Sequence, residues 1–170
     1  MKQLYFVRHG LSEMNKLGVY AGRADTPLTE TGRQQAKTAG EQARNLTMDC
    51  VVASPLKRAL ETAQIIAKEI DYPEERIIIN NLLTERDFGS MEGKPWGLDA
   101  DLEGKPGVES VDELYQRALR AYSWLHSLEH HSILVVSHGS FGEALRAIIS
   151  AENGSQFPDD LHNATIYQWL

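Results

Sequence analysis

Four short segments of this 170-residue chain carry side chains suited to phosphate chemistry. They are Arg8-His9-Gly10, Ser54-Pro55-Leu56-Lys57-Arg58, Glu85 and Ser137-His138-Gly139. Guanidinium groups and helix N-termini bind phosphate oxygens, and glycine lets the backbone approach a bound oxyanion. Neighbouring positive charges favour a neutral imidazole, which is a nucleophile, whereas a carboxyl beside a phosphate ester can keep a proton to donate. The set predicts phosphoryl transfer through a histidine.

Each segment, taken alone, also has an ordinary structural interpretation. The tripeptide at residues 8–10 could be a surface turn, His138 a hydrogen-bonded core histidine, Arg58 a helix-surface residue and Glu85 a solvated one. What favours a shared site is that each segment follows a different short apolar run. In an open parallel sheet, ligands bind beyond the carboxyl ends of the strands, so these side chains are expected at one edge.

The elements that must position these residues are legible in the sequence. Apolar runs predict strands at residues 4–7, 50–53, 77–79, 133–136 and 165–170. Between them, helices are predicted to begin at Thr29, at Ser54 with Pro55 in the first turn, at a capping box of Ser110 and Glu113, and near Gly139. Alternating apolar strands and helices predict a three-layer α/β/α sandwich with a mostly parallel sheet. We expect one domain over residues 1–170, with residues 85–109 as a long functional loop.

Charge and composition narrow the class of partner. The formal net charge is -7, which argues against a nucleic-acid partner because affinity for phosphate backbones comes from an excess of lysine and arginine. No apolar run reaches the ~18 residues of a membrane span, and the N-terminal apolar stretch is too short for a signal peptide. The single cysteine, Cys50, lies in an apolar run and is expected to be buried. The sequence predicts a cytoplasmic monomer or homodimer, without nucleic-acid or membrane partners.

Together the motifs resemble the histidine phosphatase (phosphoglycerate mutase-like) superfamily. The matching segments are residues 8–10 with Ser12 and Asn15, residues 27–32, residues 54–59 with Thr62 and Ala63, and residues 137–139. The resemblance implies that His9 is transiently phosphorylated, that Arg8, Arg58 and His138 hold the phosphoryl group, and that Glu85 is the proton donor and later the base. It implies no metal and no cofactor. The phosphate-binding residues expected in addition are Gly10, Ser12, Asn15, Gly22, Arg23 and Gly139.

The same resemblance bears on the reaction. Residues 85–93 resemble the phosphatase version of this loop, and the chain lacks the longer insertion typical of mutases. We therefore expect a metal-independent phosphomonoesterase that takes a small phosphorylated metabolite and releases phosphate. Small α-ribazole phosphate phosphatases resemble this loop closely, which makes α-ribazole phosphate the specific candidate. Mutase-type phosphotransfer and protein phosphohistidine phosphatase activity stay as alternatives, although small phosphatases of the latter kind typically lack an acid like Glu85. Leu11 and Met91 depart from the family pattern.

Several other residues have two readings. The secondary candidates are Arg23, Arg86, Glu109, Ser110 and Arg117. Arg117 could face either solvent or the pocket, and Trp96 could stack on substrate or pack the loop. His126, His130, His131 and His162 are interpreted as surface or turn residues. Two other classes are weighed: a metal-dependent hydrolase using His9, His138 and Glu143, which nearby arginines disfavour, and a non-catalytic phospho-ligand binding domain.

Overall fold

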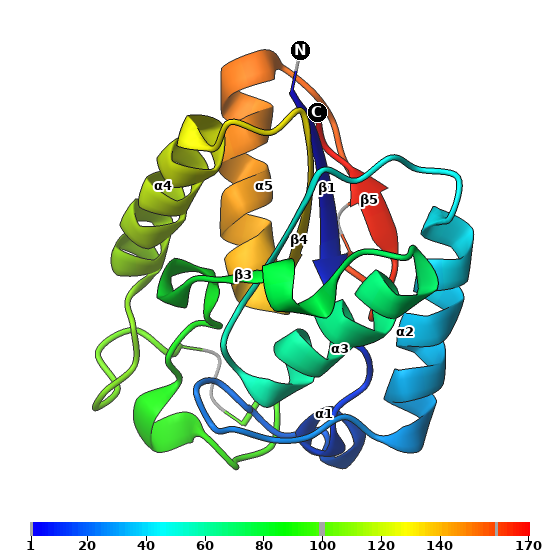
Figure 1. The fold of residues 1–170 in the computed structure, drawn as a ribbon. Coiled ribbons are helices and arrows are strands. Elements are labelled where there is room, and N and C mark those ends of the chain that lie inside the picture. Colours follow the sequence, from blue (N-terminus) through cyan, green and yellow to red (C-terminus); the bar gives the residue numbers. More distant parts are fainter. Residues whose placement is uncertain (1, 99–100, 159) are drawn as a thin grey trace.

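The fold is built on one five-stranded sheet, seen in a computed structural model that describes residues 2–98, 101–158 and 160–170 (Figure 1). The spatial order of the strands is β3-β2-β4-β1-β5. The strands are β1 (Gln3–Arg8), β2 (Cys50–Ala53), β3 (Ile78–Ile79), β4 (Ser132–Ser137) and β5 (Ile166–Gln168). All neighbouring pairs are parallel except β1 and β5. The predicted mostly parallel sheet is confirmed, with the last strand shorter than predicted and antiparallel at the edge.

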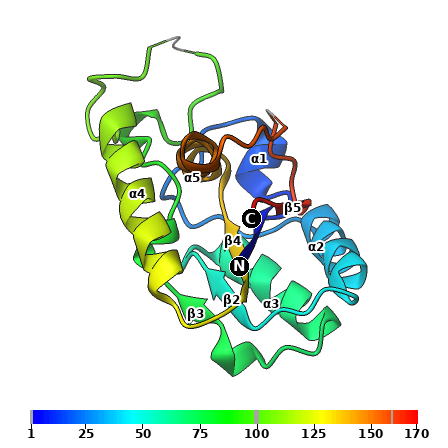
Figure 2. The same ribbon diagram turned by 90° about the horizontal axis from the view of Figure 1, so that it is seen from above.

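Helices cover both faces of this sheet (Figure 2). The α-helices are α1 (Glu13–Leu17), α2 (Glu30–Ala43), α3 (Lys57–Glu69), α4 (Val111–Ser127) and α5 (Gly139–Asn153). Side chains of β1 alternate between two cores: Leu4 and Phe6 pack with residues of α4 and α5, whereas Tyr5 and Val7 pack with residues of α2 and α3. The three-layer α/β/α sandwich is therefore confirmed.

The helix starts follow the predicted caps at α2 and α4 but not at α3. Thr29 accepts a hydrogen bond from the Gly32 N–H, and Ser110 forms the predicted capping box. Helix α3 instead begins at Lys57, because the preceding residue, Leu56, has an extended conformation. The Ser54 hydroxyl, predicted to cap that helix, accepts from Leu56 N and bonds to the imidazole of His138.

Helix α1 was not predicted, because five residues are too few to show a helical apolar period. Its ends are nonetheless well defined: Ser12 and Asn15 form a reciprocal capping box, and Gly18 ends the helix in the left-handed conformation. This short helix directs the chain from the end of β1 toward the long segment that leads to α2 (Figure 1).

The predicted loop of residues 85–109 is irregular apart from one 3-10 turn, η3 (Gly89–Met91); residues 99 and 100 lie outside the described part. Two further 3-10 turns, η1 (Glu74–Arg76) and η2 (Asn81–Leu83), flank β3. Cys50 is fully buried as predicted, and burial raises the pKa of its thiol to about 11. Of the helices that the structure describes, none combines the length and apolar character needed to cross a membrane.

Candidate active site

A cavity of about 280 Å³ lies beyond the carboxyl end of β1 and beside the start of α5. Its described walls are formed by Arg8, His9, Asn15, Tyr20, Ala21, Gly22, Arg58, Glu85, Phe88, Trp96, Gly139, Ser140 and Glu143. The structure thus brings together both arginines, the first histidine and the glutamate singled out in the sequence. They come from the end of β1, the first turn of α3 and the segment after η2, as the position of ligand sites in parallel sheets predicts.

The hydrogen bonds of His9 fix the state of its ring. The side chain is only 2% exposed, and its Nδ1 atom lies 2.7 Å from the Gly10 carbonyl oxygen. Because a carbonyl can only accept, the neutral ring must carry its hydrogen on Nδ1, which leaves the lone pair on Nε2. The Arg58 Nε–H donates to that Nε2 atom at 3.2 Å.

The environment keeps His9 neutral. Burial is the largest cause that holds the pKa of His9 well below its usual range, and the charges of Arg58 and Arg8 lower it further. The direction agrees with the expectation from the sequence. The leading cause differs, because that expectation rested on the neighbouring cations alone.

The two arginines are held in different ways. Arg58 is almost fully buried and donates to the carbonyl oxygens of Gly22 at 2.7 Å and Ala24 at 2.9 Å. Arg8 donates through Nη1 to the Leu161 carbonyl at 2.9 Å, whereas its buried Nε–H has no partner among the described residues. A bound oxyanion would satisfy that donor, since buried N–H groups are almost always paired.

His138 lies behind His9 rather than in the cavity wall. It follows β4, its ring centroid is 5.1 Å from that of His9, and its Nε2 atom is 2.8 Å from the Ser54 hydroxyl. Its buried Nδ1 has no partner among the residues that the structure describes. Burial, followed by the charge of Arg58, holds the pKa of His138 well below its usual range.

The carboxyl group of Glu85 is positioned by backbone N–H groups. Its Oε1 atom accepts from Arg86 N at 2.8 Å and Phe141 N at 3.0 Å, and Oε2 accepts from Ser140 N at 3.3 Å. Two of these donors belong to the first turn of α5. Helix N-termini were expected to bind the phosphate, but at α5 these N–H groups hold the carboxyl of Glu85 instead.

Of the additional phosphate-binding residues predicted, Asn15, Gly22 and Gly139 line the cavity, and Gly10, Ser12 and Arg23 do not. Ser12 is fully buried and caps α1. The Gly10 N–H donates to Thr62 Oγ1 at 3.0 Å, and a Cβ atom at this position would lie 2.3 Å from the Gly32 carbonyl oxygen. Backbone packing therefore accounts for a glycine at this position.

Sequence reasoning missed several residues of the wall. Tyr20, Ala21 and Ser140 have no family motif in the sequence that marks them, and Glu143 was considered only as a metal ligand. Trp96 lines the cavity and is 50% exposed, which leaves its ring accessible to a ligand. Met91 is buried and is absent from the wall, so this departure from the family pattern does not alter the cavity surface. The four histidines interpreted as surface or turn residues also lie outside it.

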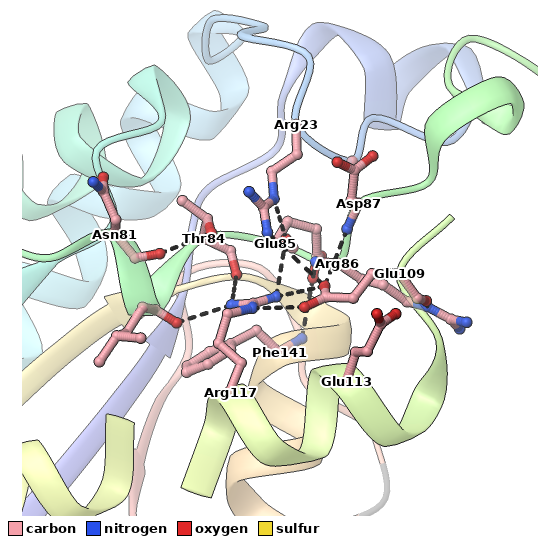
Figure 3. A network of polar contacts seen from close by, with 12 residues as sticks. Arg23, Asn81, Thr84, Glu85, Arg86, Asp87, Glu109, Glu113, Arg117 and Phe141 are labelled. Atoms are coloured by element: carbon pink, nitrogen blue, oxygen red, sulfur yellow. Dashed lines mark hydrogen bonds and ion pairs between the residues drawn. The ribbon is translucent and has the colours of Figure 1, made fainter. Parts of the chain in front are cut away.

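The structure excludes a solvent-facing Arg117, although this residue does not line the cavity either. Its guanidinium is buried beside the cavity and forms ion-paired hydrogen bonds with both carboxylate oxygens of Glu109, at 2.8 and 2.7 Å (Figure 3). The solvated-face reading is therefore wrong. Arg23 donates to the Glu85 carbonyl at 2.8 Å, and Arg86 donates to the Glu109 carbonyl at 2.8 Å. Four of the secondary candidates, Arg23, Arg86, Glu109 and Arg117, thus form one polar network next to the acid, whereas Ser110 caps α4 together with Glu113.

The metal-site alternative lacks a ligand cluster. Among the described residues, no group of three or more histidine, cysteine, aspartate or glutamate side chains could hold a metal ion. His9, His138 and Glu143 therefore do not assemble into the ligand set considered from the sequence.

Comparison with known proteins agrees with this geometry. Residues 4–169 match the Histidine phosphatase superfamily (branch 1), and the chain belongs to that family. It is 34% identical to a phosphoglycerate mutase of Schizosaccharomyces pombe, over 86% of this chain and 77% of the relative. It is 32% identical to PhoE, an uncharacterised phosphatase of Bacillus subtilis, over 88% of this chain and 78% of that one.

A solved structure from Escherichia coli, provisionally named an α-ribazole-5'-P phosphatase, superposes with a TM-score of 0.83 at 26% identity, covering 99% of this chain and 90% of the other. Similar proteins thus include both phosphatases and mutases.

Proposed function

We propose that this protein is a phosphomonoesterase that works through a phosphohistidine intermediate on His9. The single observation that supports this most directly is the tautomer of His9. Its Nδ1–H is held by the Gly10 carbonyl, so the lone pair of a buried neutral ring sits on Nε2, which meets Arg58 at the cavity. A nucleophile in this form needs no separate base.

In the first half-reaction, the phosphoryl group enters between Arg8 and Arg58. The Arg58 N–H that meets His9 Nε2 moves to a phosphoryl oxygen, and the partnerless Arg8 Nε–H binds another. The His9 Nε2 lone pair then forms the N–P bond while the P–O bond to the leaving group breaks. Positioning and charge neutralisation supply most of the rate in such a transfer.

Glu85 gives its proton to the leaving oxygen during that step. A protonated carboxyl has one accepting oxygen and one O–H donor. Oε1 accepts two N–H bonds of 2.8 and 3.0 Å, whereas Oε2 accepts one bond at 3.3 Å, so Oε2 is the oxygen that we expect to carry the transferable proton. In the second half-reaction the resulting carboxylate removes a proton from water, the water oxygen bonds to phosphorus, the N–P bond breaks and phosphate leaves.

The wall of the cavity favours hydrolysis over mutase activity. A phosphoglycerate mutase must hold a substrate with anionic groups at both ends. Besides the arginines, the lining of this cavity includes the rings of Tyr20, Phe88 and Trp96 and the carboxylate of Glu143. A carboxylate at the mouth repels a second anionic group, so esters with an uncharged or aromatic leaving group fit better.

The natural substrate we favour is a small phosphorylated metabolite, with α-ribazole phosphate the specific candidate. Support comes from the resemblance of residues 85–93 and from the fold of the provisionally named E. coli protein. Mutase activity is the second candidate, because the S. pombe relative is a phosphoglycerate mutase.

The decisive experiment measures turnover of p-nitrophenyl phosphate and trapping of an acid-labile phosphoenzyme by the purified protein, with and without a chelator. We expect turnover and trapping in both conditions. His9→Asn should abolish both, and the exposed His131→Asn should leave both unchanged. Equal turnover by His9→Asn would attribute the activity to a contaminant, and loss on chelation would overturn the metal-independent mechanism.

A second assay separates the candidate substrates. The enzyme is incubated with α-ribazole phosphate, phosphoserine and 3-phosphoglycerate, and both free phosphate and the 2-isomer of phosphoglycerate are measured. Phosphate release without isomer supports the hydrolase, whereas isomer formation would replace it with the mutase. Phosphate binding without any turnover would indicate the non-catalytic domain.

A further inference from the structure

Every donor of the Arg117 guanidinium is used. Two N–H groups pair with the Glu109 carboxylate, and the other three donate to the backbone carbonyls of Leu82 at 2.8 Å, Thr84 at 2.7 Å and Glu85 at 3.2 Å (Figure 3). A guanidinium has five N–H donors, so none is left over. Because every donor of this buried cation is paired, we expect Arg117 to have a defined structural role.

This role concerns the segment that contains Glu85, the proposed general acid. Residues 84–87 belong to no helix or strand, so no regular ladder of hydrogen bonds holds their backbone. The Glu85 carbonyl is instead held by Arg117 and by Arg23, whose Nε–H donates to it at 2.8 Å. The main chain of the acid is therefore anchored by side chains of distant segments.

Arg117 also contacts the group that orients the carboxyl. Its guanidinium carbon lies 5.2 Å from the ring centroid of Phe141, within the range of a cation–π contact. The backbone N–H of the same Phe141 donates to Glu85 Oε1 at 3.0 Å. One arginine thus fixes Glu85 from its carbonyl side and packs on the residue that holds its carboxyl.

Glu109 keeps the arginine in this place. Besides the bidentate pair, its Oε2 accepts from Asp87 N at 3.3 Å and its carbonyl accepts from Arg86 Nε at 2.8 Å. Burial of the carboxyl works toward a higher pKa, but the hydrogen bonds and charge of Arg117 outweigh it and hold the pKa of Glu109 below its usual range. The pair is therefore ionised at neutral pH.

Neither Arg117 nor Glu109 lines the cavity that holds His9, so neither can touch the reacting atoms. We propose that Arg117, braced by Glu109, is a positioning residue for the acid step of Glu85. This inference rests on the proposed function and goes beyond it, because it assigns a separate role to residues outside the cavity. When Arg117 is replaced, the Glu85 proton no longer meets the leaving oxygen as the P–O bond breaks.

The consequence depends on the leaving group. General acid catalysis contributes roughly 10²–10⁴-fold, and a misplacement of about 1 Å can cost ~10²-fold. p-Nitrophenolate leaves readily without a proton, whereas the alkoxide of β-glycerophosphate does not. Loss of positioning should therefore slow the alkyl ester far more than the nitrophenyl ester. Damage to the phosphate-binding residues would slow both esters equally.

The experiment compares kcat for these two esters in the parent and in Arg117→Lys. Lysine has three donors on a single nitrogen and cannot reproduce the fork. We expect a fall of about 100-fold with β-glycerophosphate and of less than about 5-fold with p-nitrophenyl phosphate. Arg120→Lys, an exposed position on the same helix, is the matched control and should leave both values unchanged. Equal losses on both esters in Arg117→Lys would overturn the proposal.

Two further variants make the outcome decisive. Glu85→Gln shows how kcat for the two esters changes when the acid is absent. Adding Arg117→Lys to Glu85→Gln should lower kcat little further, because both substitutions affect the same step. An additive loss would refute the assignment. If Arg117→Lys does not fold, Glu109→Gln, which removes the brace and keeps the arginine, must show the same ester dependence. Failure of the parent to hydrolyse either ester would refute the proposed function itself, whereas uniform losses refute only the positioning role.

Discussion

The contact between Gly10 and Gly32 gives the sharpest prediction about this fold. A Cβ atom built at Gly10 would lie 2.3 Å from the Gly32 carbonyl oxygen, about 1 Å closer than ordinary contact. Both sides are backbone and cannot rotate away. Gly32 is itself fixed, because its N–H donates to the Thr29 hydroxyl at 2.9 Å and its own Cβ would meet the Leu11 carbonyl at 2.2 Å. Gly10→Ala must therefore displace the chain beside His9.

The expected cost follows from these distances. Overpacking of a close-packed site destabilises the folded state by about 1–3 kcal/mol. Alanine also reduces the conformational freedom of the unfolded chain, which offsets roughly 0.4–1 kcal/mol of this loss. We expect Gly10→Ala to lower the free energy of unfolding by about 2 kcal/mol, and the Tm by about 4–8 °C for a chain of this size. The displacement also moves the carbonyl that holds His9 Nδ1, so kcat should fall by about 10²-fold.

Urea denaturation and kcat for p-nitrophenyl phosphate test this reasoning. The control is Gly139→Ala, whose Cβ would have its nearest neighbour, an atom of Arg8, at 3.5 Å, an ordinary contact distance. Its free energy of unfolding should stay within about 0.5 kcal/mol of the parent. A Gly10→Ala variant as stable as Gly139→Ala would refute the steric argument.

Three other predictions concern titration and specificity. Because the pKa values of buried His9 and His138 lie well below the value of about 6.5 in an unfolded chain, the unfolded state binds more protons below pH 6.5. The free energy of unfolding in urea should therefore fall from pH 6.5 to 5 by up to about 2 kcal/mol per histidine and stay constant above pH 6.5. His138→Gln should reduce this fall, and an unchanged slope would contradict the burial of His138 in its neutral form. Glu143→Gln should lower the KM for phosphoserine or 3-phosphoglycerate several-fold and leave that for p-nitrophenyl phosphate unchanged, whereas the exposed Glu129→Gln should alter neither; equal KM changes for all esters would contradict the charge argument. The Cys50 thiol, buried and with its pKa raised to about 11, should react with a thiol reagent only in denaturant, and rapid labelling of the native protein would contradict its burial.

Local patterns in the sequence were sufficient to predict the layers of the fold. Apolar runs of three to six residues marked the strands, and the caps at Thr29 and Ser110 marked two helix starts, because a cap acts through atoms within three residues. Helix α1 was not predicted, because a single turn is too short to show a helical period. The start of α3 was misplaced because the Ser54 hydroxyl is engaged by His138, 84 residues away in the chain.

The sequence by itself determined which residues meet at the carboxyl ends of the strands. Arg8, His9, Arg58 and Glu85 could be placed there because strand direction in a parallel sheet carries the residues after each strand to one edge. That inference needs only the order of the elements along the chain.

The tertiary structure alone decided how those residues are held. That His9 is neutral chiefly through burial, that the α5 N-terminus holds Glu85, and that Arg117 braces the acid segment all depend on contacts between residues far apart in the chain. No short pattern encodes them, because desolvation and hydrogen-bond geometry are set by packing over distances of a few ångströms in space. The sequence therefore gives no sign that Arg117, a helix residue, is buried, because its burial depends on the packing of the segment that contains Glu85.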